Sequence, residues 1–153
     1  MTGTIVCGVS ESAETKEAVE LAGALASRLG LRLVLVAVVG GVPPGTEESL
    51  TARQQRAGAQ RTLDEAVRSV AGGAEGRVVV GERADALARV AAEEGADVIV
   101  VGSRAAGLAG RNLRSTLARE LEASTPVPVL VAPPSTRKRS TQRLAAAAEA
   151  AAR

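Results

Sequence analysis

Short apolar segments rich in valine alternate along the chain with longer segments in which apolar residues recur every three or four positions. Apolar runs that lack polar residues at alternate positions are typical of strands buried on both faces, as in a parallel sheet. The strands predicted on this basis cover residues 4–9, 31–39, 77–80, 97–101 and 127–132.

A helix is predicted between each pair of successive strands. The helical stripes of apolar residues lie within residues 18–29, 63–70, 86–91 and 113–121, and glycines that can end a helix follow the first three of them. Strands that alternate with helices build parallel sheets through right-handed crossovers. The sequence therefore predicts an α/β fold, an open five-stranded parallel sheet with helices on both faces.

Two segments fall outside this alternation. Residues 40–49 are rich in Gly and Pro and too long for a plain turn, which predicts a mobile loop beside the sheet. Residues 1–134 are predicted to form one domain, and residues 135–153 a basic and Ala-rich tail. The tail has high helix propensity but no useful apolar face, which favours a frayed or disordered end; a segment that binds a partner or an anionic surface is the alternative.

The composition excludes several classes of protein. Of the 153 residues, 46% are hydrophobic and 24% charged, as in ordinary globular proteins, but there is no His, Phe, Tyr or Trp. Without His, the chain has no His-based catalytic triad and no His-bearing zinc site. Without aromatic rings to stack on bases, and with a net charge of only +2, it is not expected to bind nucleic acid.

The single cysteine, Cys7, lies within an apolar run, where a buried structural thiol is expected. No apolar run reaches the roughly 18 residues that a membrane span requires. The N-terminus also lacks the basic and then apolar pattern of a secretory signal. These features favour a cytoplasmic protein with no membrane association.

A ligand site is expected where two strands end. Ligands of open parallel sheets bind outside the carboxyl ends of the strands, where the chain order reverses, which points to the segments after the first and fourth strands. The second segment, residues 102–116, combines glycines with arginines and a helix start, features that suit a phosphate group. It is not a Walker sequence, and a flexible loop with its arginines in solvent is the alternative.

Four stretches of the sequence carry a resemblance to a known family: residues 5–12 (IVCGVSES), 80–82 (VGE), 96–104 (ADVIVVGSR) and 128–131 (PVLV). With these, the chain resembles the universal stress protein family over roughly residues 3–132. The resemblance implies a Rossmann-like fold of the adenine nucleotide alpha hydrolase type with strand order 3-2-1-4-5. It also implies a homodimer paired through the last strand, at Val129, Leu130 and Val131.

Members of this family that bind ATP carry an Asp after the first strand and a spaced set of glycines followed by Ser or Thr. Gly102 and Thr116 match this pattern, whereas Ser10, Ala105 and Ser115 replace the Asp and two glycines. A Cβ at Ala105 is costly if the backbone there needs a positive φ, so the ATP motif is degenerate. The resemblance thus implies a weakened or altered site for ATP or another adenine nucleotide. Its nucleotide- or phosphate-binding positions are Ser10, Val39, Gly102, Arg104, Ala105, Gly107, Gly110, Arg111, Ser115 and Thr116.

The leading interpretation is a cytoplasmic stress-response protein that acts by binding rather than by catalysis. The sequence places no paired carboxylates and no base-activated nucleophile at the expected crevice, so no catalytic residue and no metal ligand is assigned. A nucleotide hydrolase or nucleotidyl transferase is one alternative, since folds of this type support such chemistry. A ligand-free dimerising protein is the other, because the last strand is apolar and an exposed apolar edge is normally paired.

Overall fold

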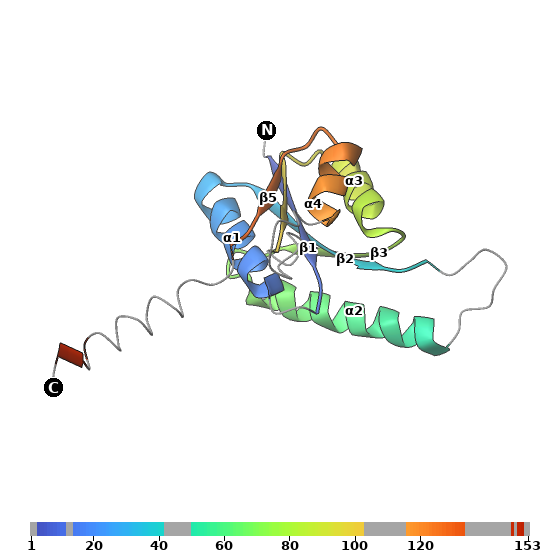
Figure 1. Cartoon of the computed structure of the whole chain (residues 1–153), viewed down its shortest axis with the longest axis horizontal. Coiled ribbons are helices and arrows are strands. Elements are labelled where there is room, and N and C mark those ends of the chain that lie inside the picture. The colour runs from blue at the N-terminus through green and yellow to red at the C-terminus, as the bar shows by residue number, and fades with distance from the viewer. Residues whose placement is uncertain are drawn as a thin grey trace.

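The computed structural model describes residues 3–11, 14–41, 50–102 and 116–133, together with residues 148, 150 and 151. Strands and helices alternate along this part of the chain (Figure 1). The strands are β1 (Thr4–Val9), β2 (Arg32–Val39), β3 (Glu75–Val80), β4 (Val98–Val101) and β5 (Val129–Val131). The helices are α1 (Glu14–Leu29), α2 (Leu50–Ser69), α3 (Arg83–Glu94) and α4 (Thr116–Ser124).

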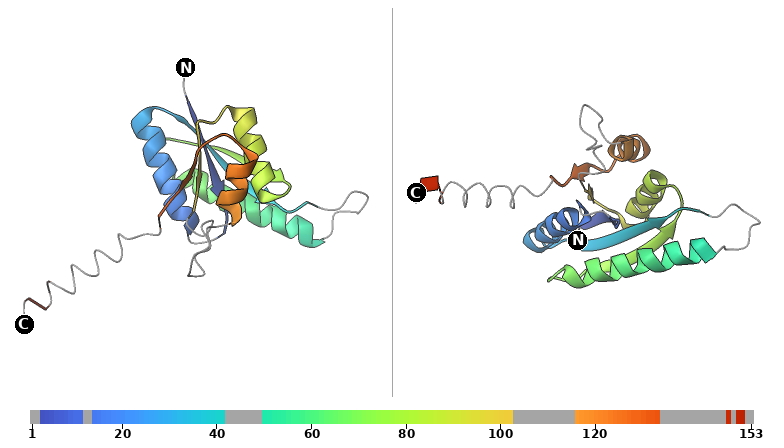
Figure 2. Two further views of the ribbon diagram at one scale, coloured as in Figure 1. Left: turned by 45° about the horizontal axis from the view of Figure 1, so that its top comes forward. Right: turned by 60° about the horizontal axis from the view of Figure 1, so that its bottom comes forward.

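The five strands form one sheet in the order β3-β2-β1-β4-β5, and every neighbouring pair is parallel. In the central register, Cys7 of β1 lies opposite Leu35 of β2 and Val100 of β4. Helices α1 and α2 cover one face of the sheet, and α3 and α4 cover the other (Figure 2). The predicted α/β fold and the strand order that the resemblance implies are both confirmed.

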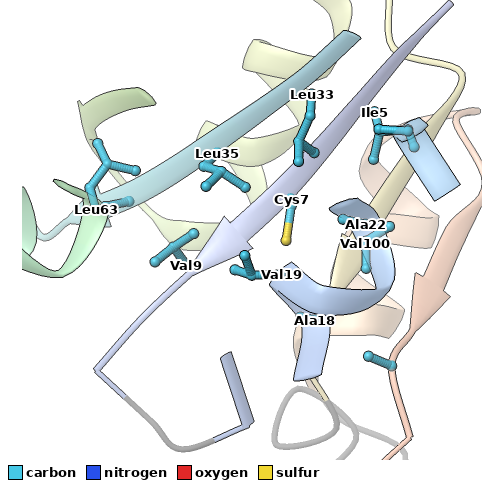
Figure 3. Packing of buried hydrophobic residues seen from close by; sticks show 13 residues of the cluster. Ile5, Cys7, Val9, Ala18, Val19, Ala22, Leu33, Leu35, Leu63 and Val100 are labelled. Atoms are coloured by element: carbon cyan, nitrogen blue, oxygen red, sulfur yellow. The ribbon is translucent and has the colours of Figure 1, made fainter. Parts of the chain in front are cut away.

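The core consists of two layers of aliphatic side chains, because successive residues of a strand point to opposite faces. Ile5, Cys7 and Val9 of β1 point toward α1 and α2, as Figure 3 shows for Cys7 and the helix α1. Val6, on the opposite side of the same strand, packs with the residues of α3 and α4. All four β1 side chains are buried, which explains why the strand appears in the sequence as a continuous apolar run.

The outer strands differ most from the predicted bounds: β5 covers only Val129–Val131, whereas the prediction is residues 127–132. β3 begins at Glu75 rather than at residue 77. The prediction misses its first two residues because Glu75 is polar and Gly76 carries no side chain, so neither extends the apolar run. A Cβ at Gly76 would lie 3.2 Å from both Leu63 and Val67 of α2, so the glycine lets that helix pack closely on the sheet. β4 begins one residue after Asp97, whose carboxylate accepts a hydrogen bond from the Thr4 amide at 2.8 Å.

Helices α1, α2 and α3 begin earlier than their apolar stripes, whereas α4 begins at Thr116, within its predicted stripe at residues 113–121, of which residues 113–115 lie outside the described part. α2 starts at Leu50, 13 residues before the predicted stripe at Leu63, and its first half is largely exposed. Among the residues of α2 that the structure describes, only Gly58 and Leu63 are buried. Gly30 and Gly95 directly follow α1 and α3, as predicted for residues that end a helix.

Cys7 is the buried thiol that the sequence predicts, and burial raises its pKa from the ordinary value of 9.0 to about 12. The neutral thiol is therefore favoured in the folded protein, whereas the unfolded chain ionises it near pH 9. Below pH 9 the thiol is neutral in both states and its ionisation costs no stability. As the pH rises from 9 toward 12, the unfolded chain loses the thiol proton while the folded protein keeps it, so the free energy of unfolding falls. Between pH 9.5 and 11 the free energy of unfolding should fall by about 1.4 kcal/mol per pH unit more steeply than in a Cys7→Ala variant.

Urea titrations of both proteins at several pH values measure this difference in slope. Equal slopes would show that the thiol ionises as readily in the folded protein as in the unfolded chain, and would contradict the assignment.

No helix in the described part of the chain is long and apolar enough to cross a membrane. Of the predicted tail, residues 135–147, 149, 152 and 153 lie outside the described residues, as do residues 42–49 of the predicted mobile loop. The division of the chain at residue 134 and the nature of the loop therefore stay predictions.

Candidate functional site

An open cleft of about 740 Å³ lies at the carboxyl ends of the central strands. The ends of β1, β2 and β4 form its floor, and residues from α2, α3 and α4 form its sides. Because α2 and α3 cover opposite faces of the sheet, the cleft crosses the carboxyl ends of the strands and has a helix on each side. This is the position at which open parallel sheets bind ligands.

The cleft brings together three of the predicted site residues. Ser10 follows β1, Val39 ends β2 and Gly102 follows β4, and all three line the same cleft. Thr116 is the first residue of α4, and its neighbour Leu117 also lines the cleft, although the Thr116 side chain is outside the described part. The remaining predicted positions lie outside the described residues: Arg104, Ala105, Gly107, Gly110, Arg111 and Ser115.

Hydrogen bonds hold the turn after β1 in place. The Ser10 amide donates to Thr15 Oγ1 at 3.0 Å, and the Ser10 and Thr15 hydroxyl oxygens are also 3.0 Å apart. Thr15 is buried at the start of α1 and lines the cleft together with Ser10. Two neutral hydroxyl groups therefore stand where the resemblance expects a carboxylate, and they can exchange hydrogen bonds with a ligand without adding negative charge.

The floor of the cleft is apolar. Val36, Val38 and Val39 of β2 line it with Leu87 of α3, and Val39 and Leu87 are both buried. The Val39 carbonyl accepts a hydrogen bond from the Gly81 amide at 2.9 Å, which ties the end of β2 to the exit of β3. An apolar surface beside hydroxyl groups suits a ligand with both an apolar and a polar part.

Helix α2 supplies one wall that the sequence analysis did not identify. Gln55, Ala59 and Thr62 of α2 line the cleft. A Cβ at Gly58 would lie 3.2 Å from Glu11 Oε1, so the absence of a side chain there lets the Glu11 carboxylate approach the helix. The segment before Leu63 is mostly polar and lacks the apolar periodicity that predicts a helix, so the sequence pattern does not identify this wall.

Two charged residues line the cleft among the residues that the structure describes. Glu11 follows β1 and Arg83 begins α3, and neither is among the site positions that the sequence predicts. Arg83 follows the segment at residues 80–82 that carried part of the resemblance, so its position after a strand could have identified it. The cleft thus combines an apolar floor, hydroxyl groups and one charge of each sign.

Comparisons with known proteins agree with this fold. The family model described as "Universal stress protein family" matches residues 1–133. A universal stress protein family structure from Burkholderia pseudomallei is 28% identical, with a TM-score of 0.66, and the match covers 86% of this chain and 96% of that one. The comparison with curated proteins found no match.

Several of the similar structures are complexes with nucleotides, and two of them illustrate the likeness. A universal stress protein in complex with cAMP is 30% identical with a TM-score of 0.66, and the match covers 85% of this chain and 95% of that one. A universal stress protein from Archaeoglobus fulgidus in complex with dAMP is 22% identical with a TM-score of 0.62, covering 86% and 97%. The fold, its strand order and the family match over most of the chain lead to one conclusion: the protein belongs to the universal stress protein family.

Proposed function

We propose that the protein binds an adenine nucleotide in the cleft and acts through that binding rather than through catalysis. The observation that carries the proposal is that Ser10, Val39 and Gly102, which come from three separate strand ends, line one cleft. Its volume of about 740 Å³ lies within the range of small-molecule sites. The structure at 30% identity, described as a complex with cAMP, supports an adenine nucleotide as the ligand class.

Each part of the nucleotide has a suitable partner in the cleft. The apolar surface at Val39 and Ala59 would hold the base, because burial of a planar apolar group needs no aromatic partner. The hydroxyl groups of Ser10 and Thr15 would exchange hydrogen bonds with the ribose. The backbone at Gly102 would approach the phosphate.

The proposal extends to the predicted positions beyond Gly102. The phosphate site would be completed by the remaining predicted positions, which are Arg104, Ala105, Gly107, Gly110, Arg111, Ser115 and Thr116. Because Ala105 and Ser115 replace glycines, we expect weaker phosphate binding than in a chain with the full pattern. Steady Mg-dependent ATP turnover by the pure protein would overturn the binding-only part of the proposal and favour a nucleotide hydrolase or transferase.

We also propose that the protein is a cytoplasmic homodimer that pairs through β5. This strand ends the sheet, and its three residues Val129, Leu130 and Val131 are all apolar. The opposite edge strand, β3, carries Glu75 and Arg77, and charged residues of this kind discourage pairing at an edge. The difference between the two edges supports β5 as the interface.

Nucleotide binding predicts a specific loss in a Gly102→Val variant. The added side chain would occupy the cleft beside β4 and hold the phosphate away from the backbone. We expect AMP to raise the melting temperature of the unchanged protein, and the affinity for AMP to fall about tenfold in the variant. Isothermal titration calorimetry measures the affinities, and thermal unfolding measures the shift.

Gly72→Val is the matched control, because Gly72 is exposed and a Cβ there would meet no atom within 4 Å. This control should bind AMP as the unchanged protein does. If Gly102→Val binds AMP as tightly as Gly72→Val, then Gly102 does not border the site, and the proposed cleft is the wrong one.

A further inference from the structure

Arg83 enters the cleft from a wall that neither predicted ligand loop supplies. It is the first residue of α3 and lines the cleft from the exit of β3. One helical turn later, Leu87 is buried against the sheet and also lines the cleft, and a Cβ at Gly8 would lie 3.4 Å from its Cδ1. The close packing of Leu87 therefore fixes the start of α3, and with it the base of the Arg83 side chain, beside the cleft.

The Arg83 side chain is exposed, and its guanidinium group has no ion-pair partner in the described part of the chain. The neighbouring Glu82 carboxylate instead accepts a hydrogen bond from the Asp85 amide at 3.1 Å. By contrast, Arg77 within β3 contacts both Glu93 and Glu94, at 2.9 and 3.1 Å. Arg83 thus offers the cleft a positive charge and hydrogen-bond donors that no described carboxylate occupies.

The only carboxylate among the described lining residues lies on the other wall. Glu11 approaches α2 at Gly58, whereas Arg83 belongs to α3 on the opposite face of the sheet. An anionic group in the cleft is repelled by Glu11 and attracted by Arg83, so the two charges favour a single orientation. The anionic end of a ligand should face α3, and its hydroxyl or amino groups should face α2.

Resting on the proposed nucleotide site, we infer that Arg83 binds the phosphate of the ligand and so makes the cleft selective for nucleotides over nucleosides. A guanidinium group can donate two parallel hydrogen bonds to phosphate oxygens, and such charge-assisted bonds are roughly twice as strong as hydrogen bonds between neutral groups. This contact comes from the β3–α3 connection, outside the glycine-containing segment that follows β4. It adds a phosphate contact in a chain whose glycine pattern is incomplete.

The test compares AMP with adenosine, which differ by the phosphate alone. We expect Arg83→Ala to lower the affinity for AMP about tenfold and to leave the affinity for adenosine within about twofold. Arg83→Lys should lose about threefold for AMP, because an ammonium group keeps the charge but not the paired donors. Arg61→Ala, which removes an exposed arginine of α2 outside the cleft, should change neither affinity.

The outcomes separate this inference from the proposed function. If the unchanged protein binds AMP and Arg83→Ala binds it equally well, the role of Arg83 is wrong while the nucleotide site stands. If Arg83→Ala weakens AMP and adenosine by the same factor, Arg83 does not act on the phosphate, and the inference is again overturned. If the unchanged protein binds neither compound, the proposed function fails and the inference fails with it.

Discussion

Replacing Leu63 by alanine is expected to lower the free energy of unfolding by about 3 kcal/mol. Leu63 is only 2% exposed and is the one large side chain of α2 that is fully buried in the described structure. It packs against Gly76 of β3, where a Cβ would lie 3.2 Å from its side-chain carbons. Because Gly76 has no side chain that could move into the space, the variant should keep most of the cavity that it creates.

Leu50→Ala is the matched control on the same helix, since Leu50 is 73% exposed. It should change the free energy of unfolding by less than about 0.5 kcal/mol. Urea unfolding followed by circular dichroism measures both variants. If the two substitutions cost the same, α2 is not held on the sheet through Leu63.

The same substitution should also affect the cleft. Gln55, Ala59 and Thr62, which line it, precede Leu63 on α2 and depend on the helix for their position. Loosening α2 should therefore weaken AMP binding even at temperatures where the variant is fully folded. Leu50→Ala should retain the affinity of the unchanged protein.

The interior of the sheet could be predicted from the sequence because burial on both faces leaves a direct trace. The run at residues 4–9 matches β1 residue for residue, and the run at 31–39 differs from β2 only at its first position. Strands at the edges leave a weaker trace. β3 begins with Glu75 and Gly76, whose polar or missing side chains are not those of a buried strand, so its start was placed two residues late.

Asp97 shows how a polar residue can be assigned to the wrong element. It adjoins the apolar run of β4 and was included in that strand, but its carboxylate accepts a hydrogen bond from the Thr4 amide. This contact joins residues 93 positions apart, and no local pattern contains it. The long polar start of α2 was missed for a related reason, because an exposed helical segment needs no apolar period.

The candidate site was predicted as far as a topological rule reaches. Ser10 and Gly102 were identified because they follow strands on either side of the point where the chain order reverses, and both line the cleft. Arg83 and the wall from α2 were missed, because the rule selects strand ends and not the helices that lean over them. Their positions depend on packing, namely Leu87 against β1 and Leu63 against β3.

Replacing Leu130 by arginine is expected to convert the proposed dimer into a monomer. Leu130 is 38% exposed in the middle of β5, at the edge of the sheet. In a twofold-symmetric dimer each interface residue is contributed by both copies, so one substitution introduces two guanidinium groups. Burial of these charges without partners should weaken association at least about 100-fold, since each 1.4 kcal/mol of desolvation or repulsion is a factor of ten.

Val80→Arg is the matched control, because Val80 is 42% exposed on the opposite edge strand. Gel filtration with light scattering at micromolar concentration should give a dimer for the unchanged protein and for Val80→Arg, and a monomer for Leu130→Arg. Circular dichroism shows whether Leu130→Arg keeps its fold. A monomeric unchanged protein would refute the dimer, and a dimer that Val80→Arg disrupts but Leu130→Arg does not would move the interface to β3. We expect only Leu130→Arg to disrupt the dimer, because β3 already carries Glu75 and Arg77 whereas β5 carries only aliphatic side chains.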